Sequence, residues 1–187
     1  MLNSLGKLLE SEKKDKSIID IIAYGSSVKG KDTPSDIDIM ILFADGSLRE
    51  RLNKLQDIKT KIKTKMTEKV DVKQMLLKDF FDSAFLARTG ILLEGVSIFN
   101  GNSFSETLGF KSYALFWYNL ANLNHTQKVI FNYILAGRKR KGVIEELEGI
   151  RISNGAIKIP IKNSLTFEKI LQNNNISFNK KNILEEA

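Results

Sequence analysis

Apolar residues gather in short runs near the start of the chain, and these runs predict strands. One run extends from Ile18 to Ala23 and stops at Gly25-Ser26, and a second begins at Asp36. Short apolar runs bounded by turn residues are typical of buried strands. We therefore expect strands over residues 17–24 and 36–43, and a third over 68–74, where two valines flank Asp71.

Helical spacing of apolar residues predicts helices around these strands. Residues 2–14 carry leucines at this spacing, and residues 48–66 carry a longer apolar stripe. Ser47 and Glu50 form the sequence pattern of a capping box, which places the start of the longer helix. Another amphipathic helix is expected over residues 76–88.

The second half of the chain predicts helices and one hairpin. An aromatic stripe indicates a helix over residues 105–122, and a second helix begins near Asn124 or Thr126 and ends at Gly137. A short helix over 143–147 precedes residues 150–161, where apolar residues alternate on both sides of Asn154-Gly155, a strong hairpin signal. Three helices followed by a hairpin is the order of winged-helix modules. The tail after Gln172 is polar, so we expect it to be loosely packed.

These elements predict an α/β protein with two parts. The turn residues Asn100-Gly101-Asn102-Ser103 suggest a boundary, so the parts are expected at 1–100 and 101–187. The first part would carry a mixed sheet flanked by helices, and the second would be a helical module with a β-hairpin.

Composition restricts the chemistry that the chain can perform. Its 187 residues include no cysteine and one histidine, which excludes disulfides, thiolate zinc sites and histidine clusters. Any metal must therefore be held by oxygen. No apolar stretch approaches the length of a membrane span, and the N-terminus leads into charged residues, so we expect a cytoplasmic protein.

The positive charge of the chain lies mainly in its second half. The formal net charge is +7, and residues 111–187 hold 12 Lys and Arg against 6 Asp and Glu. Four of these cations are consecutive: Arg138, Lys139, Arg140 and Lys141. This basic tetrad could grip nucleic-acid phosphates or simply complement the end of the preceding helix.

The strongest chemical signal lies between residues 24 and 41. Asp36 and Asp38 are two residues apart on a predicted strand, so both face the same way while Ile37 faces a core. Two adjacent carboxylates repel unless a cation lies between them, and Mg²⁺ is a hard ion that prefers such oxygen ligands. Gly25 and Ser26 lie at a turn, where backbone amides can bind an anion. A site for both metal and phosphate indicates phosphoryl or nucleotidyl transfer.

The motif of Gly25-Ser26, a nine-residue gap and Asp36-Ile37-Asp38 resembles the signature of the DNA polymerase β-like nucleotidyltransferase superfamily, most closely the minimal nucleotidyltransferases. The resemblance covers about residues 17–100. Lys29 stands where family members usually carry arginine. The resemblance implies that a third carboxylate, Asp71, joins Asp36 and Asp38 as metal ligand and catalytic group. The three carboxylates would bind two Mg²⁺ ions, or Mn²⁺. It also implies that Gly25, Ser26, Ser27 and Lys29 bind the phosphates of an NTP.

The implied reaction moves a nucleoside monophosphate from an NTP, most readily ATP, to an acceptor hydroxyl. The basic second half favours RNA as the acceptor, with Arg138–Lys141 as candidate contacts. One alternative is the antitoxin role of some minimal nucleotidyltransferases, which adenylylate a HEPN-like toxin partner. Another is a non-catalytic nucleic-acid-binding protein on the same fold.

Overall fold

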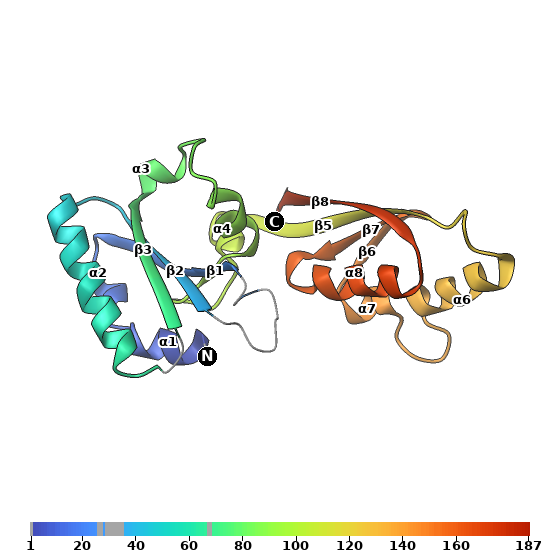
Figure 1. Ribbon diagram of the computed structural model, residues 1–187, viewed down its shortest axis with the longest axis horizontal. Helices are drawn as coiled ribbons and strands as arrows, with labels where there is room; N and C mark the ends of the chain where they lie inside the picture. The colour runs from blue at the N-terminus through green and yellow to red at the C-terminus, as the bar shows by residue number, and fades with distance from the viewer. Residues whose placement is uncertain (1, 26–27, 29–35, 67–68) are drawn as a thin grey trace. The chain divides into compact units, whose positions relative to one another are not determined.

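The computed structural model describes residues 2–25, 28, 36–66 and 69–187. The chain divides into two compact units, Met1–Gly109 and Phe110–Ala187. Each unit contains one four-stranded sheet with its own helices (Figure 1).

The sheet of the first unit is mixed, as expected. Its strands are β1 (Ile18–Tyr24), β2 (Asp36–Phe43), β3 (Lys69–Leu76) and β4 (Val96–Ser97), in the order β3-β2-β1-β4. β1 pairs antiparallel with β2 and β4, whereas β2 pairs parallel with β3. The three strands predicted from the apolar runs are therefore confirmed within a few residues.

Helices cover both faces of this sheet. On one face, α1 (Leu2–Leu8) and α2 (Leu48–Lys63) bury the side chains of Ile37, Ile39 and Ile41, and a 3₁₀ turn (Glu12–Lys14) follows α1. On the other face, α3 (Leu77–Phe80), α4 (Arg88–Glu94) and α5 (Phe104–Thr107) pack against Met40 and Leu42. The alternation of side chains along β2 thus gives two separate apolar cores.

The single helix predicted over residues 76–88 is wrong. Residues 69–76 form one strand, α3 is only four residues long, and a turn segment leads to α4 at Arg88. Phe80 is 3% exposed while Phe81 is 72% exposed, so only part of the apolar pattern in this segment reflects a buried face.

The sheet of the second unit is antiparallel, with helices on one face. Its strands are β5 (Phe110–Asn119), β6 (Ile150–Ser153), β7 (Ala156–Pro160) and β8 (Ser177–Glu186), in the order β6-β7-β5-β8. Its helices are α6 (His125–Ala136), α7 (Val143–Glu146) and α8 (Ser164–Asn173), with a 3₁₀ turn (Ile161–Asn163) before α8. They enclose a core around Phe116, Phe131 and Phe167.

Two sequence predictions for this unit are wrong. Residues 110–119 form β5 at the middle of the sheet rather than part of a helix over 105–122. The tail after Gln172 is not loosely packed, because β8 pairs with the whole length of β5, from Ser177↔Asn119 to Glu186↔Phe110. Because residues 110–119 form a strand, the first of the three helices of the predicted winged-helix order is missing from its place. The sequence reasoning also missed α8.

Other predictions for the helices and the hairpin are confirmed. Ser47 caps α2 in a complete capping box with Glu50, and Asn124 caps α6 in another with Gln127. Gly137 ends α6 with a φ of 77°. β6 and β7 form the hairpin expected around Asn154-Gly155.

In the part of the chain that the structure describes, no helix is both long and apolar enough to cross a membrane.

Candidate active site

The register of the first sheet brings the predicted carboxylates to neighbouring positions. Asp38 on β2 lies opposite Asp71 on β3, and on its other side it lies opposite Tyr24 at the end of β1. Asp36 lies two residues before Asp38 on the same strand, opposite Lys69. Since Ile37 and Ile39 are fully buried against α1 and α2, Asp36 and Asp38 face the other side of the sheet.

Among the described residues, the helices on this side of the sheet do not pack over the carboxylates. The apolar contacts with α3, α4 and α5 begin further along the strands, at Met40 on β2 and Met75 on β3. The Asp36 and Asp71 side chains are 43% and 47% exposed. A ligand from solution can therefore reach these carboxylates without any movement of the core.

Gly25 shapes the end of β1 beside these carboxylates. Its φ of 79° lies in the left-handed region, which favours glycine. A Cβ atom at this position would lie 2.8 Å from Asp38 Oδ2, closer than real Cβ contacts come. Both the backbone conformation and the close approach require glycine, and both leave room at the Asp38 carboxylate.

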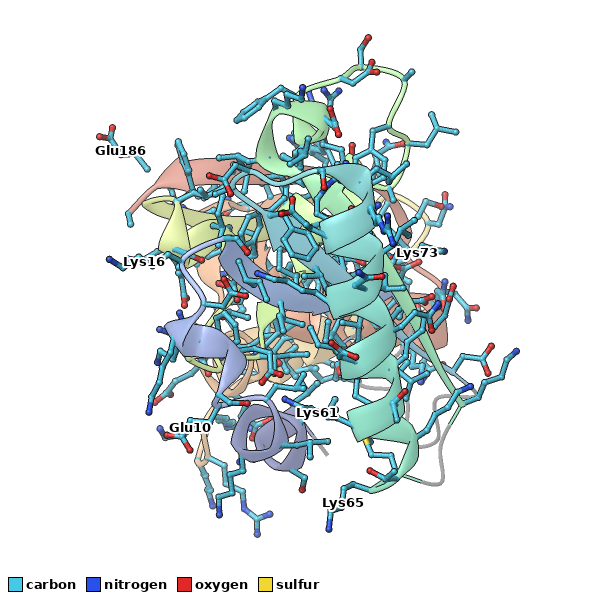
Figure 2. The ribbon with its side chains drawn as sticks, turned by 90° about the vertical axis from the view of Figure 1, so that its left-hand side faces the viewer. Glu10, Lys16, Lys61, Lys65, Lys73 and Glu186 are labelled. Atoms are coloured by element: carbon cyan, nitrogen blue, oxygen red, sulfur yellow. The ribbon has the colours of Figure 1, made fainter. Side chains whose placement is uncertain are left out.

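Two lysines on β3 neutralise two of the three carboxylates. Lys69 Nζ lies 3.4 Å from Asp36 Oδ2, and Lys73 Nζ lies 3.1 Å from Asp71 Oδ2. The three residues Lys69, Asp71 and Lys73 share one face of the strand because they are two residues apart. Lys73 is labelled in Figure 2.

The groups of this face influence one another electrostatically. The hydrogen bond to Asp71 raises the pKa of Lys73, and the nearby Tyr24 and Asp38 act in the same direction. Burial raises the pKa of the Tyr24 hydroxyl, and the charges of Asp38 and Asp71 add to this, while Lys73 opposes it. Tyr24, Asp38, Asp71 and Lys73 therefore form one coupled cluster from three adjacent strands.

The donors present at this site match a hard divalent cation in their chemistry. Carboxylate oxygens come from two neighbouring strands, and Gly25 keeps the space next to Asp38 clear. Within the described residues, no three acidic or histidine side chains converge into a group that could hold a metal ion. In this arrangement Asp36 and Asp71 are oriented to the lysine ammonium groups, which a divalent cation would have to replace.

The structure brings together four of the predicted site residues: Gly25, Asp36, Asp38 and Asp71. Ser26, Ser27 and Lys29 lie outside the described residues. The sequence reasoning missed Tyr24 and Lys73. The position of Lys73, two residues after Asp71 on a predicted strand, was a signal that could have identified it.

The basic tetrad belongs to the second unit, between α6 and α7, and all four residues are exposed. The Arg138 guanidinium lies 5.1 Å from the centre of the Tyr133 ring, and Lys141 forms a 2.9 Å ion pair with Glu145. Two of the four cations therefore already have partners within their own unit.

The first unit of the chain is similar to known proteins. The family described as "Polymerase beta, Nucleotidyltransferase" matches residues 6–102, just over half of the chain. No curated protein matches the chain. Among solved structures, a chain from the crystal structure of a mutant of the toxin-antitoxin MntA-HpeT is 22% identical, covers 58% of this chain and 79% of that chain, and has a TM-score of 0.37. The family match spans all four strands of the sheet that carries the carboxylates.

Proposed function

Because this chain belongs to the polymerase beta nucleotidyltransferase family, we propose that it transfers a nucleoside monophosphate from an NTP to an acceptor hydroxyl and releases pyrophosphate. The observation that carries this proposal is the register of β2 and β3. It sets Asp38 opposite Asp71, with Asp36 next along the strand and Gly25 against Asp38.

Each residue of the site has a role in this reaction. Asp36 and Asp38 would hold divalent cations, with Asp71 as the third carboxylate, and Mg²⁺ or Mn²⁺ suits these oxygen donors. Such ions lower the pKa of the attacking hydroxyl and offset the charge of the phosphates. Gly25, Ser26, Ser27 and Lys29 would bind the β- and γ-phosphates, and ATP is the expected donor.

Lys69 and Lys73 fit this scheme as counter-ions that the metal replaces. They limit the repulsion between the carboxylates, since each lies within ion-pair distance of one of them. With Asp71 engaged by a divalent cation, the Lys73 ammonium would be available to a phosphate oxygen of the donor.

We propose RNA as the acceptor, on the strength of the charge distribution. The second unit holds 12 Lys and Arg against 6 Asp and Glu, whereas the first unit is close to neutral. A polyanion is attracted to such a surface at low salt. Within the exposed tetrad, Lys139 and Arg140 have no ion pair among the described residues and are the best candidates for phosphate contacts.

A protein acceptor is the second candidate, and a separate observation favours it. The face of the second sheet opposite its helices carries Trp117 and Ile150, which are 41% and 45% exposed. Large apolar side chains exposed on one face are typical of protein-binding surfaces. A toxin-like partner whose hydroxyl is adenylylated would use this surface.

The experiment is to incubate the purified chain with each α-labelled NTP, Mg²⁺ and separate pools of RNA and protein. We expect label in the RNA pool, most strongly with ATP. Asp38→Asn should reduce labelling about a thousandfold, because losing a metal ligand removes several kcal/mol of transition-state stabilisation. Asp45→Asn, an exposed turn residue outside the site, is the matched control and should label as well as the wild type.

The outcomes separate the three hypotheses. Label in the protein pool alone would replace RNA with a protein acceptor. Equal labelling by Asp38→Asn and the wild type, or no label in either pool, would contradict the catalytic proposal and favour a non-catalytic binding protein. Replacing Arg138–Lys141 with alanine should weaken RNA labelling and its salt dependence, and unchanged labelling would exclude the tetrad as a contact.

A further inference from the structure

A cavity of about 620 Å³ lies in the first unit, at the outer edge of β3. Its lining comes from β2, β3, α2 and the segment that follows β3. Met40, Lys73, Met75 and Phe85 belong to the carboxylate side of the sheet, and Leu52, Leu55 and Gln74 to the α2 side, with Asp79, Asp82 and Ala84 at the rim. Its volume lies in the range of small-molecule pockets.

Along β2 and β3, the lining of the cavity begins two residues after the carboxylates. Met40 follows Asp38 by two residues on the same face of β2, and Lys73 follows Asp71 in the same way on β3. A strand rises about 3.3 Å per residue, so the cavity starts roughly 7 Å further along the sheet than the carboxylates. Lys73 joins the two regions, since it contacts Asp71 at 3.1 Å and also lines the cavity.

The direction of the strands orients a bound NTP. Gly25 follows Tyr24 at the end of β1, and Tyr24 lies opposite Asp38, so Gly25 is on the side of the carboxylates away from Met40. If the β- and γ-phosphates bind at the turn and the α-phosphate at the carboxylates, the rest of the nucleotide extends along β2 and β3 toward the cavity. The covalent order of an NTP thus matches the order of turn, carboxylates and cavity.

The lining suits a nucleoside. Two methionines, two leucines and Phe85 provide apolar and aromatic surface, on which a base can pack. Phe85 is held in place by Phe80, whose ring centre lies 6.2 Å away. At the rim, Asp79 and Asp82 offer only acceptor oxygens, which recognise O–H and N–H donors such as ribose hydroxyls and base amino groups.

From this geometry we propose that the cavity receives the nucleoside of the donor NTP, with Phe85 as the packing surface of the base. The inference rests on the proposed nucleotidyl transfer and adds to it the place of the base. The base is therefore recognised at the edge of β3, away from the turn that binds the phosphates.

The test compares two probes by calorimetry in the presence of Mg²⁺. One is α,β-methylene-ATP, which cannot transfer its nucleotide, and the other is inorganic tripolyphosphate, which lacks a nucleoside. Phe85→Ala should weaken binding of the nucleotide about tenfold or more, because base stacking on an aromatic side chain contributes this much, and should leave tripolyphosphate binding unchanged. Leu86→Ala is the matched control, since Leu86 is the next residue and is 91% exposed.

A second variant keeps the test decisive if Phe85→Ala disturbs the packing of Phe80. Ala84→Trp adds a large side chain at the rim of the cavity without removing a core contact. It should block the nucleotide and spare tripolyphosphate. If both variants bind the nucleotide like the wild type, the cavity does not hold the nucleoside. If the wild type binds neither probe, the proposed function itself fails.

Discussion

The two sheets of this protein differ in how their faces are covered. The first sheet has helices on both faces, and among the described residues no helix packs over the stretch of β2 and β3 where Asp36, Asp38 and Asp71 lie. The second sheet has helices on one face (Figure 1), and Trp117 and Ile150 are exposed on the other. Partial coverage yields a confined site suited to chemistry, whereas an open face is suited to contact with a large partner.

The two units also differ in net charge. The unit with the carboxylates has 17 Lys and Arg against 16 Asp and Glu, and the second unit has an excess of 6 cations. The nearly neutral unit holds its cations next to its carboxylates, as Lys69 and Lys73 show. The second unit presents its excess charge to solvent, which agrees with a role in binding the acceptor.

The largest expected effect tests the two faces of the second sheet. Phe116 is fully buried and Trp117, the next residue, is 41% exposed. Phe116→Ala should lower the free energy of unfolding of the second unit by about 3–5 kcal/mol, the usual cost of removing a buried phenylalanine. Trp117→Ala should cost about 1 kcal/mol or less. Chemical denaturation of each variant measures both.

These two substitutions also distinguish a strand from a helix at residues 116 and 117. On a helix residues 116 and 117 would share the buried side of the predicted aromatic stripe, and both substitutions would then be costly. Comparable losses from Phe116→Ala and Trp117→Ala would contradict the position of β5 described above.

A smaller effect tests whether the units are independent. Ser47 and Asn124 cap α2 and α6 with the same kind of capping box, one in each unit. Ser47→Ala and Asn124→Ala should each cost about 1 kcal/mol, because the backbone N–H that each side chain caps loses its acceptor. Amide hydrogen exchange should show the loss in the first unit for Ser47→Ala and in the second for Asn124→Ala. A loss of protection that spreads through both units would show that they unfold together.

The smallest effect concerns a buried carboxyl that only the first unit has. Asp20 on β1 is 5% exposed, and its Oδ1 accepts hydrogen bonds from Ile21 N at 2.7 Å and Ser97 Oγ at 2.8 Å. Burial raises the pKa of Asp20, although these hydrogen bonds and the charge of Lys13 oppose the change. In the pH range between its ordinary pKa and the raised one, the folded state binds more protons than the unfolded state. Stability therefore falls as the pH rises through that range.

Asp20→Asn should remove this contribution while keeping an oxygen acceptor for both hydrogen bonds. We expect the stability of the first unit to depend less on pH, in the range above the ordinary pKa of aspartate, in this variant, as measured by thermal unfolding. Asp57→Asn, on α2, controls for the loss of one negative charge. An identical pH dependence in wild type and Asp20→Asn would show that Asp20 does not titrate differently in the two states.

The sequence predicted the first unit well because its central strands, β1 and β2, are buried on both faces over most of their length. Runs such as Ile37 to Phe43 are apolar at nearly every position, and a turn precedes or follows each. The β5 strand was misread since both of its faces carry apolar residues. Tyr113, Phe116 and Trp117 fit helical spacing, while the residues that are buried, Ala114, Phe116 and Tyr118, follow the alternation of a strand.

The polar tail illustrates a second limit. β8 pairs with β5 through its backbone, and most of its side chains are exposed, so its apolar pattern is weak. The candidate site shows a similar division. Asp36 and Asp38 were visible from their spacing, whereas the proximity of Tyr24 and Lys73 to them depends on the register between three strands, which local spacing does not determine.

The pairing of β8 with β5 has a consequence for how the chain folds during synthesis. β5 is a central strand, and its first residue, Phe110, pairs with Glu186. The first unit can form its sheet from residues that have all left the ribosome earlier, but β5 keeps one edge unpaired until β8 emerges. Contacts so distant in sequence form slowly, and an unpaired strand edge invites wrong partners. Of the two units, the second is thus the more exposed to misfolding in the nascent chain, and it completes its fold after the first.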